Sequence, residues 1–188
     1  MSKIIENIKK HINVSPELEK EILSSFKVEE LKRKELFIRE GQYNVSLAFI
    51  QLGILRCFNL KNGKDITNDF FFENTFVTDY GSLIENFPAR QNFEVIENSI
   101  IQKISRDKLL ALTAKFPELK TWGAKMAETL FTQSLKKQSS LKSDSPEERY
   151  ISILQEKPEI IQRIPLSLIS SYLGITQVHL SRIRKNLK

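Results

Sequence analysis

Residues 164–185 read IPLSLISSYLGITQVHLSRIRK, a pattern typical of two short helices joined by a tight turn. Ile169 and Leu173 are four residues apart, so they lie on the same face of the first helix. Gly174 allows the positive φ that a short turn between crossing helices requires. Thr176 can cap the second helix by accepting a backbone N–H from its first turn. The segment therefore predicts a helix-turn-helix unit.

The second helix of this unit has one apolar side and one basic side. Leu180, Ile183 and Leu187 recur at positions i, i+3 and i+7, which places them in a single stripe. Residues 176–188 contain no acidic residue and four basic ones, which are Arg182, Arg184, Lys185 and Lys188. A helix of this kind suits the major groove of DNA. The alternative is an ordinary amphipathic hairpin with a solvated charged face.

The composition is that of a globular protein with a modest positive charge. The 188 residues are 40% hydrophobic and 28% charged, which excludes a disordered chain. The net charge is 29 − 23 = +6, which permits a nucleic-acid partner without requiring one. The first ten residues alternate isoleucine with charged residues, and no run is long enough to span a membrane. We therefore expect a cytoplasmic protein.

Residues of the reactive types are too few and too scattered for an enzyme. Cys57 is the only cysteine and lies in a strand-like run, where a buried small hydrophobic side chain is expected. His11 and His179 are the only histidines, and neither lies in a predicted strand. The chain has no glycine-rich phosphate loop and no nucleophile elbow. We expect no enzymatic activity, no metal site and no resident cofactor.

A series of short strands precedes the long helical part of the chain. The predicted strands span residues 35–39, 47–52, 54–60, 65–72, 91–96 and 99–104. Asn62-Gly63 stands between two of them, and this dipeptide is the strongest short-range signal for a hairpin. Many short strands with regular turns predict a β-roll that encloses a core. Two short helices are expected within residues 2–25 and a brief one at residues 79–84.

A long helix is predicted from Glu118 to about Lys142, because this segment has no proline and only one glycine. Its apolar residues near one side are Leu119, Trp122, Met126, Leu130 and Phe131. A helix this long between two domains favours packing on its twin in a homodimer. Ser145, Pro146 and Glu148 then form a capping box at the start of another helix, which would complete a three-helix unit.

The predicted fold class is α+β in three parts. A β-roll (jelly-roll) sensor domain spans residues 1–115, and a long connecting or dimerisation helix spans residues 116–143. A helical helix-turn-helix domain spans residues 144–188.

This order of elements resembles the Crp/Fnr family of bacterial transcription regulators over essentially the whole chain. The resemblance rests on Gly41, Gly53-Ile54-Leu55-Arg56, Asn62-Gly63, Leu173-Gly174-Ile175 and Leu180-Ser181-Arg182-Ile183. The chain is most similar to the short members from Bacteroidetes-type bacteria, which share the Glu-Glu-Arg-Tyr start seen here at residues 147–150. The resemblance implies a sensor domain like a cyclic-nucleotide-binding domain, and a homodimer that reads a two-fold symmetric operator in double-stranded DNA. RNA polymerase is a further candidate partner.

The resemblance also implies roles for the second helix of the pair. The expected base contacts are Gln177, Val178, His179 and Arg182. Arginine can pair bidentately with guanine and glutamine with adenine, each pair giving about 1–3 kcal/mol of discrimination. Val178 could touch a thymine methyl group or simply pack. The expected phosphate contacts are Thr176, Ser181 and Lys185.

The ligand segment departs from the family pattern. Members that bind cyclic AMP carry a Gly-Glu-Leu segment and, about ten residues later, an Arg-Ser/Thr-Ala segment, which hold the ribose hydroxyl and the cyclic phosphate. Residues 75–79 read Thr-Phe-Val-Thr-Asp, and only Arg90 remains of the second segment. Arg90 is a candidate anion-binding residue, and a plain surface arginine is the alternative. We expect no tight binding of cyclic AMP, and the effector is unknown.

Two other functions remain open on the sequence alone. One is a small-molecule-binding β-roll with an incidental helical tail. The other is a protein-interaction module whose helical tail docks a partner without binding DNA.

Overall fold

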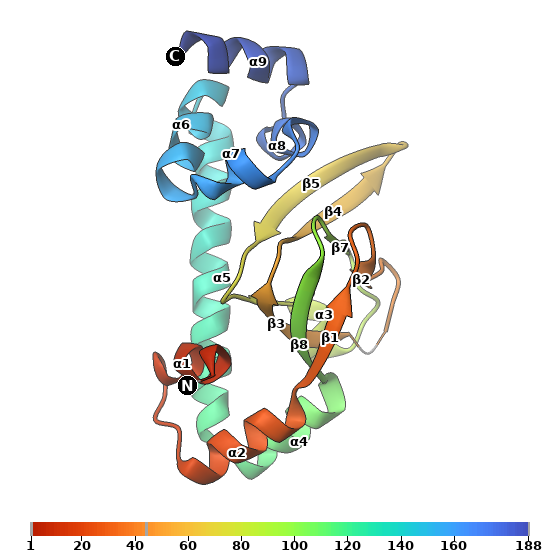
Figure 1. Ribbon diagram of the computed structural model, residues 1–188, viewed down its shortest axis with the longest axis vertical. Coiled ribbons are helices and arrows are strands. Elements are labelled where there is room, and N and C mark those ends of the chain that lie inside the picture. The colour runs from red at the N-terminus through yellow and green to blue at the C-terminus, as the bar shows by residue number, and fades with distance from the viewer. Residues whose placement is uncertain (1, 44, 188) are drawn as a thin grey trace. The chain divides into compact units, whose positions relative to one another are not determined.

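The computed structural model describes residues 2–43 and 45–187 (Figure 1). The chain forms two compact units. The first is built on the residues up to Asn59 and on Asp69–Glu128, and the second on Leu60–Asn68 and the residues from Thr129 onward. Each unit is described by itself.

The first unit contains two antiparallel sheets of four strands, with orders β1-β8-β3-β6 and β2-β7-β4-β5. The strands are β1 (Lys27–Leu31), β2 (Leu36–Ile38), β3 (Ser46–Leu52), β4 (Leu55–Lys61), β5 (Lys64–Phe71), β6 (Phe76–Val77), β7 (Asn92–Val95) and β8 (Ser99–Ser105). The tip of the β4–β5 hairpin, Leu60–Asn68, belongs to the second unit. The predicted β-roll is confirmed.

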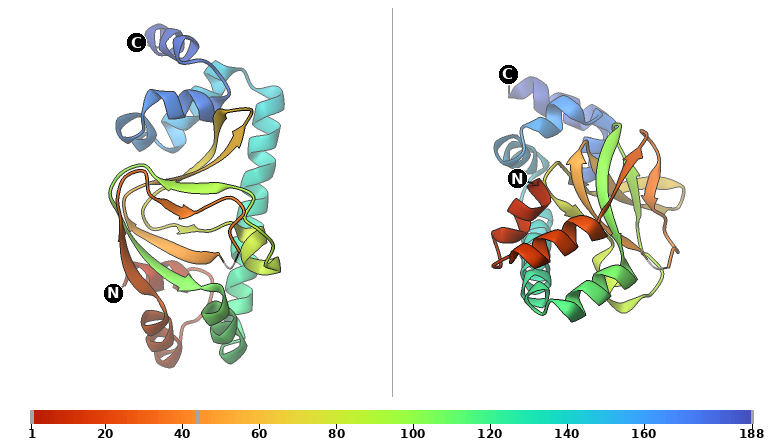
Figure 2. Two further views of the ribbon diagram at one scale, coloured as in Figure 1. Left: turned by 90° about the vertical axis from the view of Figure 1, so that its right-hand side faces the viewer. Right: turned by 60° about the horizontal axis from the view of Figure 1, so that its bottom comes forward.

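Five helices accompany these strands. They are α1 (Lys3–Lys9), α2 (Pro16–Ser25), α3 (Tyr80–Glu85), α4 (Arg106–Lys115) and the first part of α5 (Glu118–Ser143). Helices α2 and α4 lie side by side at one end of the β-roll in both views (Figures 1 and 2). An aromatic cluster ties α5 to the roll, because the Phe76 ring packs edge-on against both Phe49 and Trp122. Phe49 and Trp122 are both buried in the hydrophobic core.

The predicted hairpin turn is confirmed at Asn62-Gly63. Strand β4 ends at Lys61 and β5 begins at Lys64, so the loop has two residues. Both residues have positive φ, 51° for Asn62 and 72° for Gly63, as a type I′ turn requires. The twist of this turn matches that of the two strands, which is why this dipeptide is found here.

The second unit contains four helices after α5, where the sequence predicted three. They are α6 (Pro146–Glu156), α7 (Glu159–Arg163), α8 (Leu166–Leu173) and α9 (Gln177–Asn186). Helix α7 was missed because five residues are too few to show a helical period. Its Ile160 is nevertheless buried. The buried apolar side chains of this unit are Tyr150, Ile153, Ile160, Ile164, Ile169, Leu173, Leu180 and Ile183.

Two strands of the first unit were also missed. Strand β1 has the sequence Lys-Val-Glu-Glu-Leu and stands at a sheet edge, where charged residues are tolerated and the apolar alternation is weak. Strand β6 has only two residues. No helix in the described part of the chain is both long enough and apolar enough to cross a membrane.

Candidate nucleic-acid interface

The turn between α8 and α9 is closed by backbone hydrogen bonds around Gly174. The Gly174 N–H donates to the Ser171 carbonyl at 3.1 Å, and the Ile175 N–H donates to the Ser170 carbonyl at 3.0 Å. This pair of bonds is the Schellman motif, which needs a residue in the left-handed region just after the helix. Gly174 has φ of 69°, so the predicted positive φ is confirmed.

Helix α9 begins where the capping residue was predicted. The Thr176 hydroxyl accepts the His179 N–H at 3.2 Å, and the Thr176 backbone is extended, as an N-cap residue requires. The cap satisfies one of the N–H groups that the first turn leaves unpaired. The direction of α9 is therefore set by Gly174 on one side of the turn and by Thr176 on the other.

The two faces of α9 separate clearly. Leu180 and Ile183 are buried, with exposed fractions of 0% and 4%. All seven residues predicted to contact DNA are exposed, namely Thr176, Gln177, Val178, His179, Ser181, Arg182 and Lys185. Leu187 is 42% exposed and does not continue the predicted apolar stripe, because α9 ends at Asn186.

The exposed face of α9 is positively charged. Arg182 and Lys185 are exposed, Arg184 is half-buried, and residues 176–187 include no acidic side chain. Lys188, the fourth basic residue of the sequence pattern, lies outside the described residues. The N-terminus of α9 adds the partial positive charge of the helix dipole and unpaired N–H groups. This face combines positive charge with amide, imidazole and hydroxyl groups that can hydrogen-bond.

Helix α6 supports the helix pair and begins with the predicted capping box. The Ser145 N–H donates to the Glu148 carboxylate at 2.7 Å, and the Glu148 N–H donates to the Ser145 hydroxyl at 3.2 Å. The bond from the Ser145 N–H lowers the pKa of Glu148, and hydrogen bonds from Ser140 and Ser143 lower the pKa of Asp144. Both carboxylates are therefore charged at neutral pH, where they stabilise the positive end of α6.

In the first unit, Arg90 lies in the loop after α3. Its guanidinium packs over the Phe87 ring, 4.6 Å from the ring centre, and the residue is exposed. Its carbonyl accepts the Asn59 side-chain amide at 2.7 Å. This stacking on a surface ring is what a plain surface arginine would do.

The carboxylate of Asp79 ties the Arg90 loop to helix α3. Its Oδ2 accepts the Arg90 N–H at 2.8 Å, and its Oδ1 accepts the Ser82 N–H at 3.2 Å. Asp79 is only 9% exposed. This role of Asp79 was not predicted, although an aspartate at the start of a helix is a normal N-cap signal. The pairing with Arg90 depends on the tertiary fold and has no local signal.

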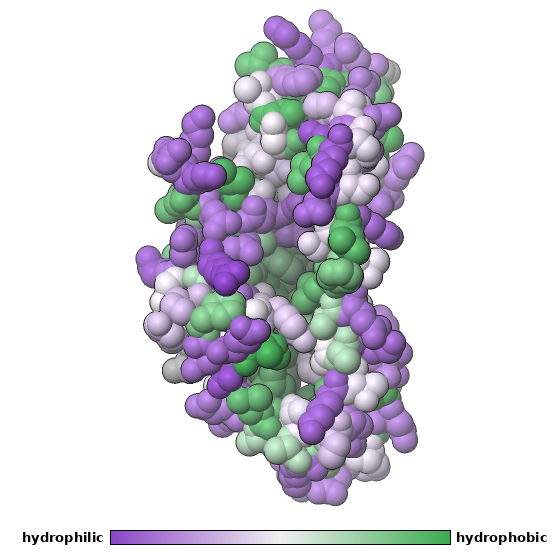
Figure 3. All heavy atoms as spheres, turned by 180° about the vertical axis from the view of Figure 1, so that it is seen from behind, coloured by the Kyte–Doolittle hydropathy of each residue, from purple (hydrophilic) through white to green (hydrophobic). Residues whose placement is uncertain are grey.

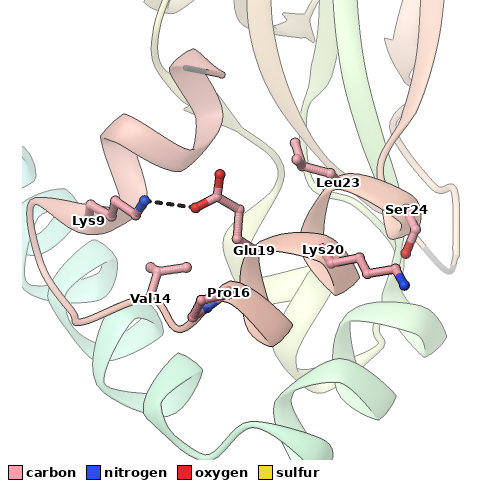
Figure 4. Close-up of a pocket in the computed structure, with 7 residues that line it drawn as sticks. All are labelled: Lys9, Val14, Pro16, Glu19, Lys20, Leu23 and Ser24. Carbon is pink, nitrogen blue, oxygen red and sulfur yellow. Dashed lines mark hydrogen bonds and ion pairs between the residues drawn. The ribbon is translucent and has the colours of Figure 1, made fainter.

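An open hollow of about 740 Å³ lies beside helices α1 and α2 (Figure 4). Its lining includes Lys9 and Glu19, which pair with each other at 2.7 Å. Lys20 also lines the hollow, so two lysines and one glutamate stand at its border. Across the described residues, no group of three or more His, Cys, Asp or Glu side chains could hold a metal ion.

The second half of α5 leaves apolar side chains uncovered. Phe131 is 65% exposed, and the other exposed apolar residues are Leu130, Leu135 and Leu141. Leu119 and Trp122, in the first half of the same helix, are buried. Figure 3 shows hydrophobic patches among hydrophilic side chains on the face opposite to that of Figure 1. Exposed apolar side chains gathered in this way indicate an interaction surface.

No protein-family model and no curated protein matches the sequence. The fold, in contrast, is that of the Crp/Fnr regulators, with a β-roll, a long helix and a helix-turn-helix. The chain is similar to the regulator CLP of Xanthomonas campestris, described as responsive to c-di-GMP, with a TM-score of 0.71 and 16% identity over 92% of this chain and 91% of that one.

Two further structures show the same fold. The FixK2 protein of Bradyrhizobium japonicum matches with a TM-score of 0.75 and 16% identity, over 86% of this chain and 84% of that chain. A protein of Eubacterium rectale described as a transcriptional regulator of the Crp/Fnr family matches with a TM-score of 0.74 and 15% identity, over 92% and 83% of the two chains. At these identities, the comparisons show the shared fold.

Proposed function

We propose that the protein is a homodimeric, sequence-specific DNA-binding transcription regulator of the Crp/Fnr type. The proposal rests on the exposed side of α9, which we call the recognition face. It consists of the seven exposed residues predicted to contact DNA, and Leu180 and Ile183 are buried on the opposite side of the helix. The fold shared with Crp/Fnr regulators supports the same conclusion. A protein with this role has no enzymatic activity and acts in the cytoplasm, where the bacterial chromosome lies.

Within α9, we assign base contacts to Gln177, Val178, His179 and Arg182, and phosphate contacts to Thr176, Ser181 and Lys185. Val178 and Arg182 are four residues apart, so they project from one side of the helix. Val178 is 63% exposed, which supports contact with a thymine methyl group over packing within the protein. Thr176 stands at the helix N-terminus, where a DNA phosphate would meet unpaired N–H groups.

The second copy of the chain covers the exposed apolar residues of α5. Helix α5 has 26 residues and is therefore about 39 Å long, which gives room for an extended helix-to-helix contact. Phe131 and Leu135 are one turn apart and both at least half exposed. A pair of chains held along α5 would present two α9 helices to two half-sites of one operator. RNA polymerase and an effector stay candidate partners.

The sensor unit is proposed not to respond to cyclic AMP. The Arg90 N–H, which lies where relatives use an Arg-Ser/Thr-Ala segment to hold the cyclic phosphate, already donates to Asp79. A phosphate at this place would meet a like charge, which disfavours binding. The Arg90 side chain stacks on Phe87 and is at the surface.

Calorimetric titration of the purified protein with cyclic AMP is expected to give no heat of binding at micromolar concentrations. Cyclic di-GMP, to which the Xanthomonas protein responds, is titrated alongside because it carries the same phosphodiester group. The Asp79→Asn variant keeps an oxygen acceptor and removes the charge, so it shows whether the carboxylate is what excludes the phosphate. A micromolar dissociation constant for cyclic AMP with the unaltered protein would contradict this part of the proposal.

The proposed function is tested by selecting genomic fragments with the purified protein, with and without candidate metabolites. We expect a set of fragments that share a two-fold symmetric sequence. A small-molecule-binding β-roll or a protein-interaction module would enrich no sequence above the background. Enrichment without any shared sequence would indicate charge-driven binding alone and would contradict a specific regulator.

A further inference from the structure

Arg149 in helix α6 joins two carbonyl groups that belong to different parts of the helical unit. Its Nη1 donates to the Asp144 carbonyl at 2.7 Å, and its Nη2 donates to the Leu173 carbonyl at 3.0 Å. Asp144 lies between the end of α5 and the start of α6, and Leu173 is the last residue of α8. One planar guanidinium therefore links the connection after α5 to the turn before α9.

The Leu173 carbonyl needs a partner from outside its own helix. The Schellman motif uses the carbonyls of Ser170 and Ser171 as acceptors for Ile175 and Gly174. The last carbonyls of a helix otherwise have no donor within the helix. Arg149 supplies a donor with a positive charge, and positive charge at a helix C-terminus is favourable. Thr176, the N-cap residue of α9, follows only three residues later.

The other end of the link is equally well defined. The Asp144 N–H donates to the Ser140 carbonyl at 2.9 Å and so continues the hydrogen bonding of α5. The capping box of Ser145 and Glu148 fixes the backbone immediately before Arg149. The Arg149 Nε is enclosed and has no hydrogen-bond partner among the residues described, so the two Nη groups make the directional contacts.

We propose that Arg149 is a positioning residue that sets the direction of α9 relative to the end of α5. Because the proposed dimer is held along α5, this link fixes the separation and rotation of the two recognition helices. Arg149 therefore determines which spacing between the two half-sites of an operator is bound. This role rests on the proposed function.

The guanidinium shape matters as well as its charge. Arginine presents donors in a rigid plane and can bridge two acceptors at fixed positions, whereas lysine carries a point charge on a flexible stem. Arg149→Lys therefore keeps the charge and loses the fixed bridge. Arg149→Ala removes both. Lys142→Ala is the matched control, because Lys142 is an exposed basic residue in the last turn of α5.

The experiment measures binding of these four proteins to labelled duplexes by fluorescence anisotropy. One duplex carries a single half-site from the selected operator, and the others carry two half-sites with the spacer changed one base pair at a time. Each base pair rotates one half-site relative to the other by about 34°. The unaltered protein and Lys142→Ala are expected to prefer one spacer by roughly tenfold or more over its neighbours.

For both Arg149 variants, we expect half-site affinity within about twofold of the unaltered protein and a spacer preference that falls to roughly threefold or less. If both variants bind the half-site normally and keep the spacer preference of the unaltered protein, the positioning role is wrong. The proposed DNA-binding function would still stand. If Arg149→Ala does not fold, Arg149→Lys decides the question. Unfolding of both variants, seen as lost helical circular dichroism, would make Arg149 a folding residue and also contradict the role.

The result for the unaltered protein distinguishes failure of the Arg149 positioning role from failure of the proposed DNA-binding function. Half-site binding by the unaltered protein supports the DNA-binding function whatever the variants do. Failure of the unaltered protein to bind any duplex would refute the proposed function, and the role of Arg149 with it.

Discussion

Replacing Arg182 with alanine is expected to remove discrimination at one base pair of each half-site. Arg182 is exposed on α9, and a bidentate arginine–guanine pair is worth about 1–3 kcal/mol, which is about 5- to 150-fold in affinity. The variant should bind the preferred operator more weakly and bind the operator altered at that base pair about as well as before. Affinities for a series of singly altered operators would measure this effect.

Lys185→Ala is the matched comparison, because Lys185 is exposed on the same helix and is assigned to a phosphate. Loss of a phosphate contact weakens binding to all sequences alike and lowers the slope of log K against log salt by about one for each protomer. Arg182→Ala should leave that slope nearly unchanged. If the two variants lose affinity in the same pattern across operators and salt concentrations, the division into base and phosphate contacts is wrong.

Replacing Phe131 with glutamate is expected to separate the proposed dimer into monomers. Phe131 is 65% exposed on α5, and a dimer contact there would bury its ring. The glutamate carboxylate would be buried at the same place without a partner, which is unfavourable. The mass by light scattering should fall from twice 21.8 kDa to 21.8 kDa. Because two linked half-sites then act separately, affinity for a full operator should fall by about 10²- to 10⁴-fold.

Leu110→Glu is the control for this change, because Leu110 is 46% exposed and lies on α4. It introduces the same charge at an exposed apolar residue outside α5 and should leave the mass and the operator affinity unaltered. A Phe131→Glu protein that stays dimeric would show that α5 is not the dimer interface. A monomeric Phe131→Glu protein with full operator affinity would show that dimerisation is not needed for binding.

Much of the helical unit could be predicted because its signals are local. Gly174 and Thr176 act on backbone groups within three residues of themselves, and so do Ser145 and Glu148 in their capping box. The Asn62-Gly63 turn is equally local. Each of these residue types has a physical reason to occupy its position, so a single sequence is sufficient to predict the structure there.

The features that could not be predicted are very short helices and strands, and hydrogen bonds between residues far apart in the sequence. Helix α7 and strand β6 are too short to show a period, and they form because Ile160 and Val77 are buried by the rest of the fold. The bond from Arg90 to Asp79 joins residues 11 apart, and the bond from Arg149 to Leu173 joins residues 24 apart. No local pattern identifies either pair.

The central claim is that the outer face of α9 lies along the edges of base pairs. The most direct test adds the purified protein to two labelled duplexes at several salt concentrations. One duplex carries the selected operator, and the other carries a scrambled sequence of the same composition. We predict a dissociation constant for the operator of about 10⁻⁸ M or tighter near physiological salt, about 10³-fold tighter than for the scrambled duplex, with affinity falling steeply as salt rises. Equal affinity for the two duplexes, or no binding to either at low ionic strength, would contradict the account.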